Sequence, residues 1–168
     1  NNSGGFIIHN AGGDATDNYG FGKFAALELT VGHGANSVGN IGLVRTGNNI
    51  GDIFFSGRTG GSSYKEHMRI TSNGNVGIGL TNPESFNSGA DNLVLQGSGN
   101  TGITIDATSS TNSSIFFADG AQGNEAYRGY AQYQHSSDTF AFGRAGVDHL
   151  YLQNDGGTKN VLGNFVVG

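Results

Sequence analysis

The chain is built from short runs in which apolar and polar residues alternate. Leu27, Leu29 and Val31 alternate with Glu28 and Thr30. The same period of two recurs at Met68/Ile70, Val76/Ile78, Leu93/Leu95, Ile103/Ile105, Phe140/Phe142 and Leu150/Leu152. Successive side chains of a strand point to opposite faces, so this pattern is typical of half-buried strands, and no segment has the 3.6-residue spacing of an amphipathic helix.

Turn signals separate these runs. They are dipeptides that tolerate the positive φ of tight hairpins, namely Asn73-Gly74, Asp119-Gly120 and Asp155-Gly156. The sequence therefore predicts an all-β fold of short antiparallel strands.

A weak internal repeat and the single proline divide the chain. Residues 51–57 are echoed by 114–120, and residues 66–70 by 148–152. Pro83 opens a polar loop between them, which predicts a first unit at 1–83 and a second at 84–168, with an insertion around 121–138. Repeats of this size are typical of units stacked along an axis.

Composition indicates that one chain is not enough to complete the core. Gly accounts for 31 of the 168 residues, which disfavours helix throughout, and Leu, Ile, Val and Phe together number only 39. The net charge of −5 is too small for charge repulsion to hold the chain open. We therefore expect copies of the chain to share a core in a fibrous, intertwined or stacked homotrimer.

Charge and cysteine content exclude several classes of partner. The 8 basic residues are scattered and outnumbered by 13 acidic ones, which argues against a nucleic-acid partner. No apolar run has the length of a membrane span, so we expect no membrane insertion. Cysteine is absent, so neither disulfides nor thiolate metal sites support the fold.

Two segments resemble a known family. Residues 66–79 read EHMRITSNGNVGIG and close with Thr81-Asn82-Pro83. This resembles a repeat of bacteriophage tail fibres, an acidic-Arg-Met-Arg-Ile strand followed by a turn and Gly-Asn-Val-Gly-Ile-Gly-Thr-Thr-x-Pro. His67 replaces the usual Arg and Leu80 the first Thr, while the alternation and both turns are kept. Residues 127–143 are similar to a second strand pair of that family.

The resemblance covers roughly residues 50–155 and implies a fibrous viral protein. Such fibres are typically homotrimers, and many carry a C-terminal self-cleaving chaperone, whose Ser-Asp-x-Arg start is not visible here. The resemblance thus implies a shaft or tip segment located in the virion, outside the cell, that contacts other tail proteins and host-surface receptors.

The densest group of aromatic and hydrogen-bonding residues is the candidate ligand site. Sugar-binding surfaces need flat aromatic faces with donors beside them. We expect contact with a glycan or another surface receptor from Tyr127, Arg128, Tyr133 and His135. Strand alternation places Tyr130 on the face opposite Tyr127 and Tyr133, and cross-strand aromatic packing is the alternative role of the cluster.

Other candidate chemistry has a structural explanation. The glycines of 74–79 suit a turn rather than a phosphate cradle, because no long helix can follow them. The acid–histidine neighbours Glu66-His67 and Asp148-His149 point to opposite faces of a strand and cannot form a dyad within one chain. In a homotrimer, three copies of His33 close to the threefold axis could together bind a metal ion.

The acids of the second unit give no reason to choose a catalytic pair; they are Asp106, Asp119, Glu125 and Asp138. We therefore expect no catalytic residue, metal or cofactor, and a trimeric tail-fibre segment contributing to host attachment. The alternatives are a polysaccharide-degrading tailspike segment and a bacterial surface adhesin repeat.

Overall fold

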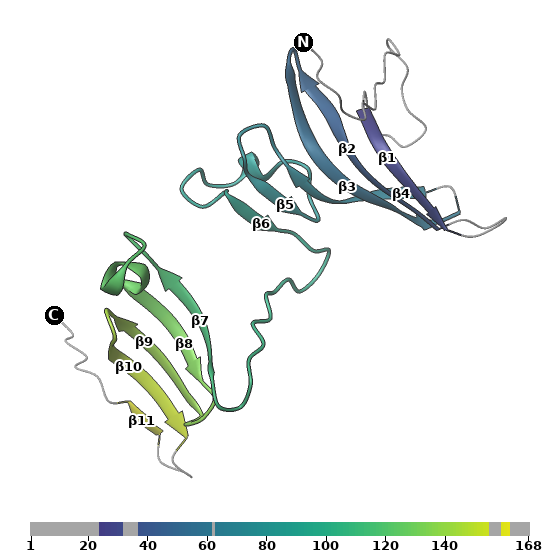
Figure 1. Ribbon diagram of the computed structural model, residues 1–168. Coiled ribbons are helices and arrows are strands. Elements are labelled where there is room, and N and C mark those ends of the chain that lie inside the picture. The colour runs from purple at the N-terminus through teal and green to yellow at the C-terminus, as the bar shows by residue number, and fades with distance from the viewer. Residues whose placement is uncertain (1–23, 32–36, 62, 155–158, 162–168) are drawn as a thin grey trace. The chain divides into compact units, whose positions relative to one another are not determined.

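The computed structural model describes residues 24–31, 37–61, 63–154 and 159–161. These residues form eleven strands and two short 3₁₀ helices, and none of them lies in an α-helix (Figure 1). The strands make two separate sheets, and the chain divides into two compact units between Gly102 and Ile103. The prediction of an all-β fold is confirmed.

The first sheet contains six strands in sequence order. They are β1 (Phe24–Val31), β2 (Ser37–Gly47), β3 (Ile50–Gly60), β4 (Ser63–Ile70), β5 (Val76–Ile78) and β6 (Leu93–Leu95). Neighbours from β1 to β5 are antiparallel, but β6 pairs with β5 in parallel. The expectation of antiparallel strands is wrong at this pair. A crossover through residues 79–92, which holds the 3₁₀ helix η1 (Pro83–Ser85), returns the chain in the same direction.

The segment that resembles the tail-fibre repeat forms β4, a turn and β5. Gly74 adopts a φ of +88° in the turn, where the Thr71 carbonyl accepts a hydrogen bond from its N–H at 2.9 Å. Gly79 has a φ of +82°, and a Cβ there would collide with the carbonyl oxygen of Gln96. That close approach lets Gln96 donate its N–H to the Ile78 carbonyl at 2.9 Å, so the glycine allows β6 to dock.

One face of the first sheet buries charged and polar side chains; we call it the ionic face. Its polar members are Asn40, Asp52, Ser56, Glu66 and Arg69, and they lie among the buried apolar side chains Val38, Val44, Phe54 and Val94. Arg69 donates to both carboxylate oxygens of Glu66 at 2.6 Å and to Asp52 at 3.1 Å. Asp52 also accepts the Ser72 N–H at 2.9 Å. The hydrogen bonds to Glu66 raise the pKa of Arg69 above its ordinary value.

The second sheet has the order β11-β10-β9-β8-β7 and is antiparallel throughout. Its strands are β7 (Asn112–Phe117), β8 (Gly129–Gln134), β9 (Thr139–Arg144), β10 (Val147–Asn154) and β11 (Lys159–Val161). The 3₁₀ helix η2 (Gly123–Tyr127) connects β7 to β8. The echoed segments 51–57 and 66–70 lie in adjacent strands, whereas their counterparts occupy β7 and β10, with β8 and β9 between them.

Some sequence expectations differ from the structure. Ile103 and Ile105 lie in an unpaired segment rather than a strand, and Asp119-Gly120 precedes η2 instead of closing a hairpin. His33 and Asp155-Gly156 fall outside the described residues.

The proposed repeat boundary and the boundary between compact units lie at different places. The loop at Pro83 connects two strands of the first sheet, while the compact units meet at residues 102 and 103. The division of the sequence into repeats at 1–83 and 84–168 stays a prediction.

The buried ion pairs of Arg69 predict a large and specific loss of stability. Replacing Arg69 by Leu leaves the Glu66 and Asp52 carboxylates buried without their cation, which costs roughly 3–5 kcal/mol of the free energy of unfolding. Urea denaturation at fixed protein concentration measures this loss. Arg128→Leu is the matched control, because it removes an exposed ion pair to Asp119 and costs at most about 1 kcal/mol. Equal losses in the two variants would contradict the structural role of Arg69.

Candidate functional site

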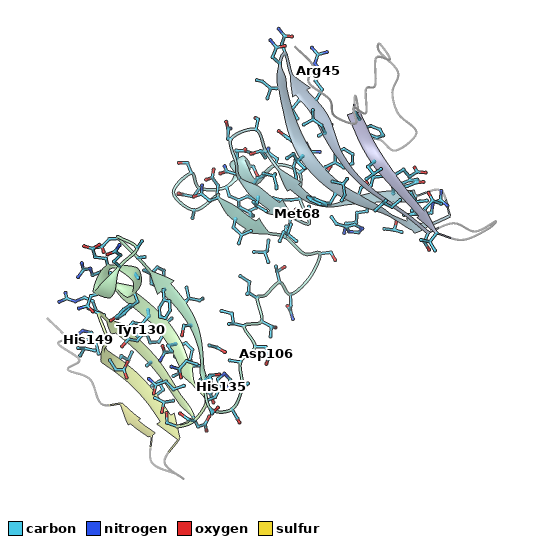
Figure 2. All side chains as sticks on the ribbon, in the orientation of Figure 1. Arg45, Met68, Asp106, Tyr130, His135 and His149 are labelled. Carbon is cyan, nitrogen blue, oxygen red and sulfur yellow. The ribbon has the colours of Figure 1, made fainter. Side chains whose placement is uncertain are left out.

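The face of the first sheet opposite the ionic face carries two unbroken rows of apolar side chains. Strand pairing places these residues side by side across all six strands. One row is Leu27, Ile41, Phe55, Met68, Ile78 and Leu95, and the other is Ala25, Leu43, Ile53, Ile70, Val76 and Leu93. We call these twelve residues the apolar stripe. Figure 2 labels Met68, which lies within it.

The apolar stripe is open to solvent in the single chain. Leu27, Ile41, Leu43, Ile53, Ile78 and Leu93 are each exposed by between 41 and 54%. On one face the sheet thus buries three charged side chains beside a small apolar group, and on the other it leaves an extended apolar surface exposed. Large exposed apolar patches of this kind mark interaction sites. Covering the exposed half of one Leu or Ile contributes roughly 1 kcal/mol.

The second sheet repeats this construction on a smaller scale. One cross-strand row is Ile115, Ala131, Phe142 and Leu150, and beside it lie Tyr133, Phe140 and Leu152. Ile115, Phe142 and Leu152 are each exposed by more than two fifths. We call these seven residues the second apolar face; like the apolar stripe, it contains no charged side chain.

The opposite face of the second sheet forms a hollow of about 350 Å³. Its lining combines aromatic rings with amide and carboxylate groups from β7, η2, β8 and β10. The residues are Phe116, Tyr127, Tyr130, Gln132, Gln134, Gly146 and Asp148. This ligand hollow and the second apolar face therefore lie on the two sides of one sheet.

Tyr130 is the fixed element of the ligand hollow. Its ring packs edge-on against Phe116 with 6.5 Å between ring centroids, and its hydroxyl donates to Asp148 Oδ1 at 2.5 Å. Burial, followed by this hydrogen bond, raises the pKa of Tyr130 to about 12. A Cβ at Gly143 on β9 would collide with the phenol, so glycine at that position makes room for the ring.

The structure separates the residues expected to form one ligand site. Tyr127 lies in η2 and lines the hollow beside Tyr130, with its ring 6.2 Å from that of Phe116. The expectation that Tyr127 and Tyr130 occupy opposite faces is wrong, because residue 127 lies in a 3₁₀ turn where strand alternation does not apply. Tyr133, in contrast, does lie opposite Tyr130, as the alternation along β8 predicts.

Arg128, Tyr133 and His135 are each engaged elsewhere. Arg128 pairs with Asp119 at 3.0 Å, and Tyr133 donates its hydroxyl to Asp138. His135 packs edge-on against the Tyr133 ring at 4.9 Å and shares a hydrogen bond with Ser113 at 3.0 Å. His135 and Tyr130 lie toward opposite ends of β8 (Figure 2). The role of Arg128, Tyr133 and His135 as ligand contacts stays a prediction.

Sequence reasoning missed Phe116 and Asp148 as lining residues of the hollow. Phe116 is the second Phe of the echoed segment 114–120, and Asp148 belongs to the other echo. Neither segment carries a local signal for binding, because only the pairing of β7, β8, β9 and β10 brings them to one face.

In both acid–histidine pairs, the carboxylate is bonded to a residue other than the neighbouring histidine. The Glu66 carboxylate is bonded to Arg69 and that of Asp148 to Tyr130, while His67 and His149 are exposed. Within the described ranges, no group of three or more His, Cys, Asp or Glu could hold a metal ion.

Comparisons with family models, curated proteins and solved structures give no significant match. A search of the described residues finds no helix that is long and apolar enough to cross a membrane.

The environment of Tyr130 predicts its titration. Absorbance of the phenolate should reveal the ionisation of Tyr130 near pH 12, and Tyr130→Phe should reduce the absorbance change there by that of one phenolate. The hydrogen bond to Asp138 also raises the pKa of Tyr133, so Tyr133→Phe separates the two contributions. Asp148→Asn should lower the pKa of Tyr130 toward 10 without reaching it, because burial is the larger cause of the shift.

The same pKa sets the direction of a stability change. Since the folded-state pKa lies above the ordinary 10.0, the neutral phenol favours folding below pH 10, and this contribution is lost as the pH rises through about 12. An absorbance change near pH 12 that is equally large in the Tyr130→Phe variant would contradict the assignment.

Proposed function

We propose that this chain is a non-enzymatic segment of a bacteriophage tail fibre, which assembles as a homotrimer in the virion and contributes to attachment at the host surface. The observation that carries the proposal is the apolar stripe, which a single chain leaves open to solvent. A chain that stays monomeric would expose this surface to non-specific association. Two further copies of the chain supply matching apolar surface.

The shape of the apolar stripe favours a shared axis. Two residues on one face of a strand are separated by roughly 7 Å, and six strands span roughly 24 Å across the sheet. The stripe is therefore narrow along the strands and long across them. Three such stripes, each from one chain, fit around a common axis that runs across the strands.

The flanks of the stripe support the same arrangement. Arg45 follows Leu43 on the same face of β2, and Lys65 lies beyond Met68 on β4; both are exposed. Charged side chains therefore limit the apolar surface along β2 and β4, as solvent-facing edges of an elongated interface do, whereas on β1 it continues through the exposed Leu29 and Val31.

The tail-fibre motif supports the assignment to a fibrous viral protein. The acidic residue and the second basic position of the motif are Glu66 and Arg69, which form the buried ion pair. The alternating Met68 and Ile70 of the same motif point to the apolar stripe. The motif thus specifies both faces of the sheet, one ionic and one available for assembly.

Thiol labelling tests whether the apolar stripe is covered. The chain has no cysteine, so single substitutions report on single positions. Leu43 is 52% exposed in the single chain, and Thr30 is exposed on the opposite face of the same sheet. In native protein, Leu43→Cys should react with a maleimide at least tenfold more slowly than Thr30→Cys, and in urea both should react at the same rate.

Leu43→Lys provides an independent check on the same position. Three lysines near one axis would repel one another and lose their hydration, so the variant should fail to assemble, whereas Thr30→Lys should assemble normally. Equal native labelling rates at positions 43 and 30, together with unchanged assembly of Leu43→Lys, would refute the proposal.

A further inference from the structure

The two sides of the second sheet differ in chemistry, one being apolar and the other partly polar, so the two sides suit different contacts. The second apolar face is suited to contact with other apolar surfaces. The ligand hollow on the other side has polar groups among its aromatic rings. We propose that the hollow binds a neutral saccharide, an inference that rests on the attachment role proposed above and gives it a ligand class.

Aromatic walls provide the stacking surface. Phe116 is 53% exposed, and its ring lies at 6.2 Å from Tyr127 and 6.5 Å from Tyr130. Tyr130 is itself almost fully buried, and its ring packs against that of Phe116 and supports it. The C–H face of a pyranose ring packs on such an exposed, supported aromatic face, whose burial contributes hydrophobic free energy.

The polar groups of the hollow match sugar hydroxyls. Asp148 already accepts hydrogen bonds from Tyr130 and, at 3.4 Å, from Gln134, and its two oxygens have further lone pairs for ligand hydroxyls. Gln132 accepts from Ser114 at 3.1 Å, which orients its amide. Within the part of the chain that the structure describes, the amide nitrogen of Gln132 has no hydrogen-bond acceptor, so it is available as a donor.

The negative charge of the hollow favours a neutral ligand over an acidic one. The lining of the hollow includes the carboxylate of Asp148 and neither Lys nor Arg. A sialic or uronic acid would bring its own carboxylate beside that of Asp148 without a compensating cation, which is unfavourable. A neutral hexose has hydroxyl donors for the Asp148 carboxylate and acceptors for the Gln132 amide.

Size and polarity also favour a saccharide over a protein surface. At about 350 Å³ the hollow is near the lower end of ligand pockets, which fits a short oligosaccharide better than a folded partner. A protein interface would bury Gln132, Gln134 and Asp148 with unpaired groups, whereas sugar hydroxyls replace water one for one. Binding by one hollow is weak, and copies of the chain multiply it through avidity.

Saturation-transfer NMR on the full chain tests the inference. The neutral probes are methyl glucoside, methyl galactoside and N-acetylglucosamine, and the acidic probes are sialic acid and galacturonic acid. We expect transfer to at least one neutral probe and to neither acidic probe. Phe116→Ala should weaken that binding about tenfold or more, and Gln132→Ala should weaken it as well.

Phe117→Ala is the matched control, because Phe117 follows Phe116 on β7, is 63% exposed and points to the other side of the sheet. It should retain saccharide binding per chain. Transfer to no neutral probe, preferential binding of an acidic probe, or equal binding by Phe116→Ala and the unmodified chain would overturn the inference.

Failure of this inference is distinguishable from failure of the proposed function. The hollow lies within one chain, so saccharide binding is measured per chain, whereas assembly is measured by thiol labelling at position 43. A covered apolar stripe without saccharide binding would refute the ligand site alone. Saccharide binding by a chain whose stripe is uncovered would refute the trimer alone.

Discussion

The constraint on which the structure depends is that the ionic face of the first sheet buries Arg69, Glu66 and Asp52 with only a few apolar side chains, while the larger apolar surface lies on the other face. Arg69 satisfies Glu66 and Asp52 on one face, so the chain can bury charge at that place. The apolar stripe is consequently left on the outside of the single chain. In the proposed assembly, the apolar residues of the stripe contribute to a core that copies of the chain complete, so the low content of Leu, Ile, Val and Phe does not prevent a core from forming.

We propose different roles for the two sides of the second sheet. Its apolar side repeats the construction of the first sheet, while its other side holds Tyr130 between Phe116 and Asp148 in a partly polar hollow. A fixed aromatic residue with its hydroxyl already bonded is a preorganised wall, and preorganisation reduces the entropic cost of binding. The proposed assembly and the proposed ligand contact thus use different sides of this sheet and different residues.

Alternation was enough to predict most strands, because Leu27, Met68, Val76, Leu93, Phe140 and Leu150 all begin or continue two-residue periods that lie in strands. It failed for Ile103 and Ile105, which pair with no strand among the residues that the structure describes. Tyr127 was misplaced because a 3₁₀ turn changes the direction of its side chain. Asp148 could not be assigned to the hollow, since only the register of β8, β9 and β10 brings it to Tyr130.

The central claim is that copies of this chain cover the apolar stripe, and the molar mass of the native protein tests it most directly. Light scattering on a sizing column should give a species of three chains, each of 17.3 kDa, that persists on dilution. A folded species with the mass of one chain would contradict the account, because the apolar stripe would then not be covered by copies of the chain.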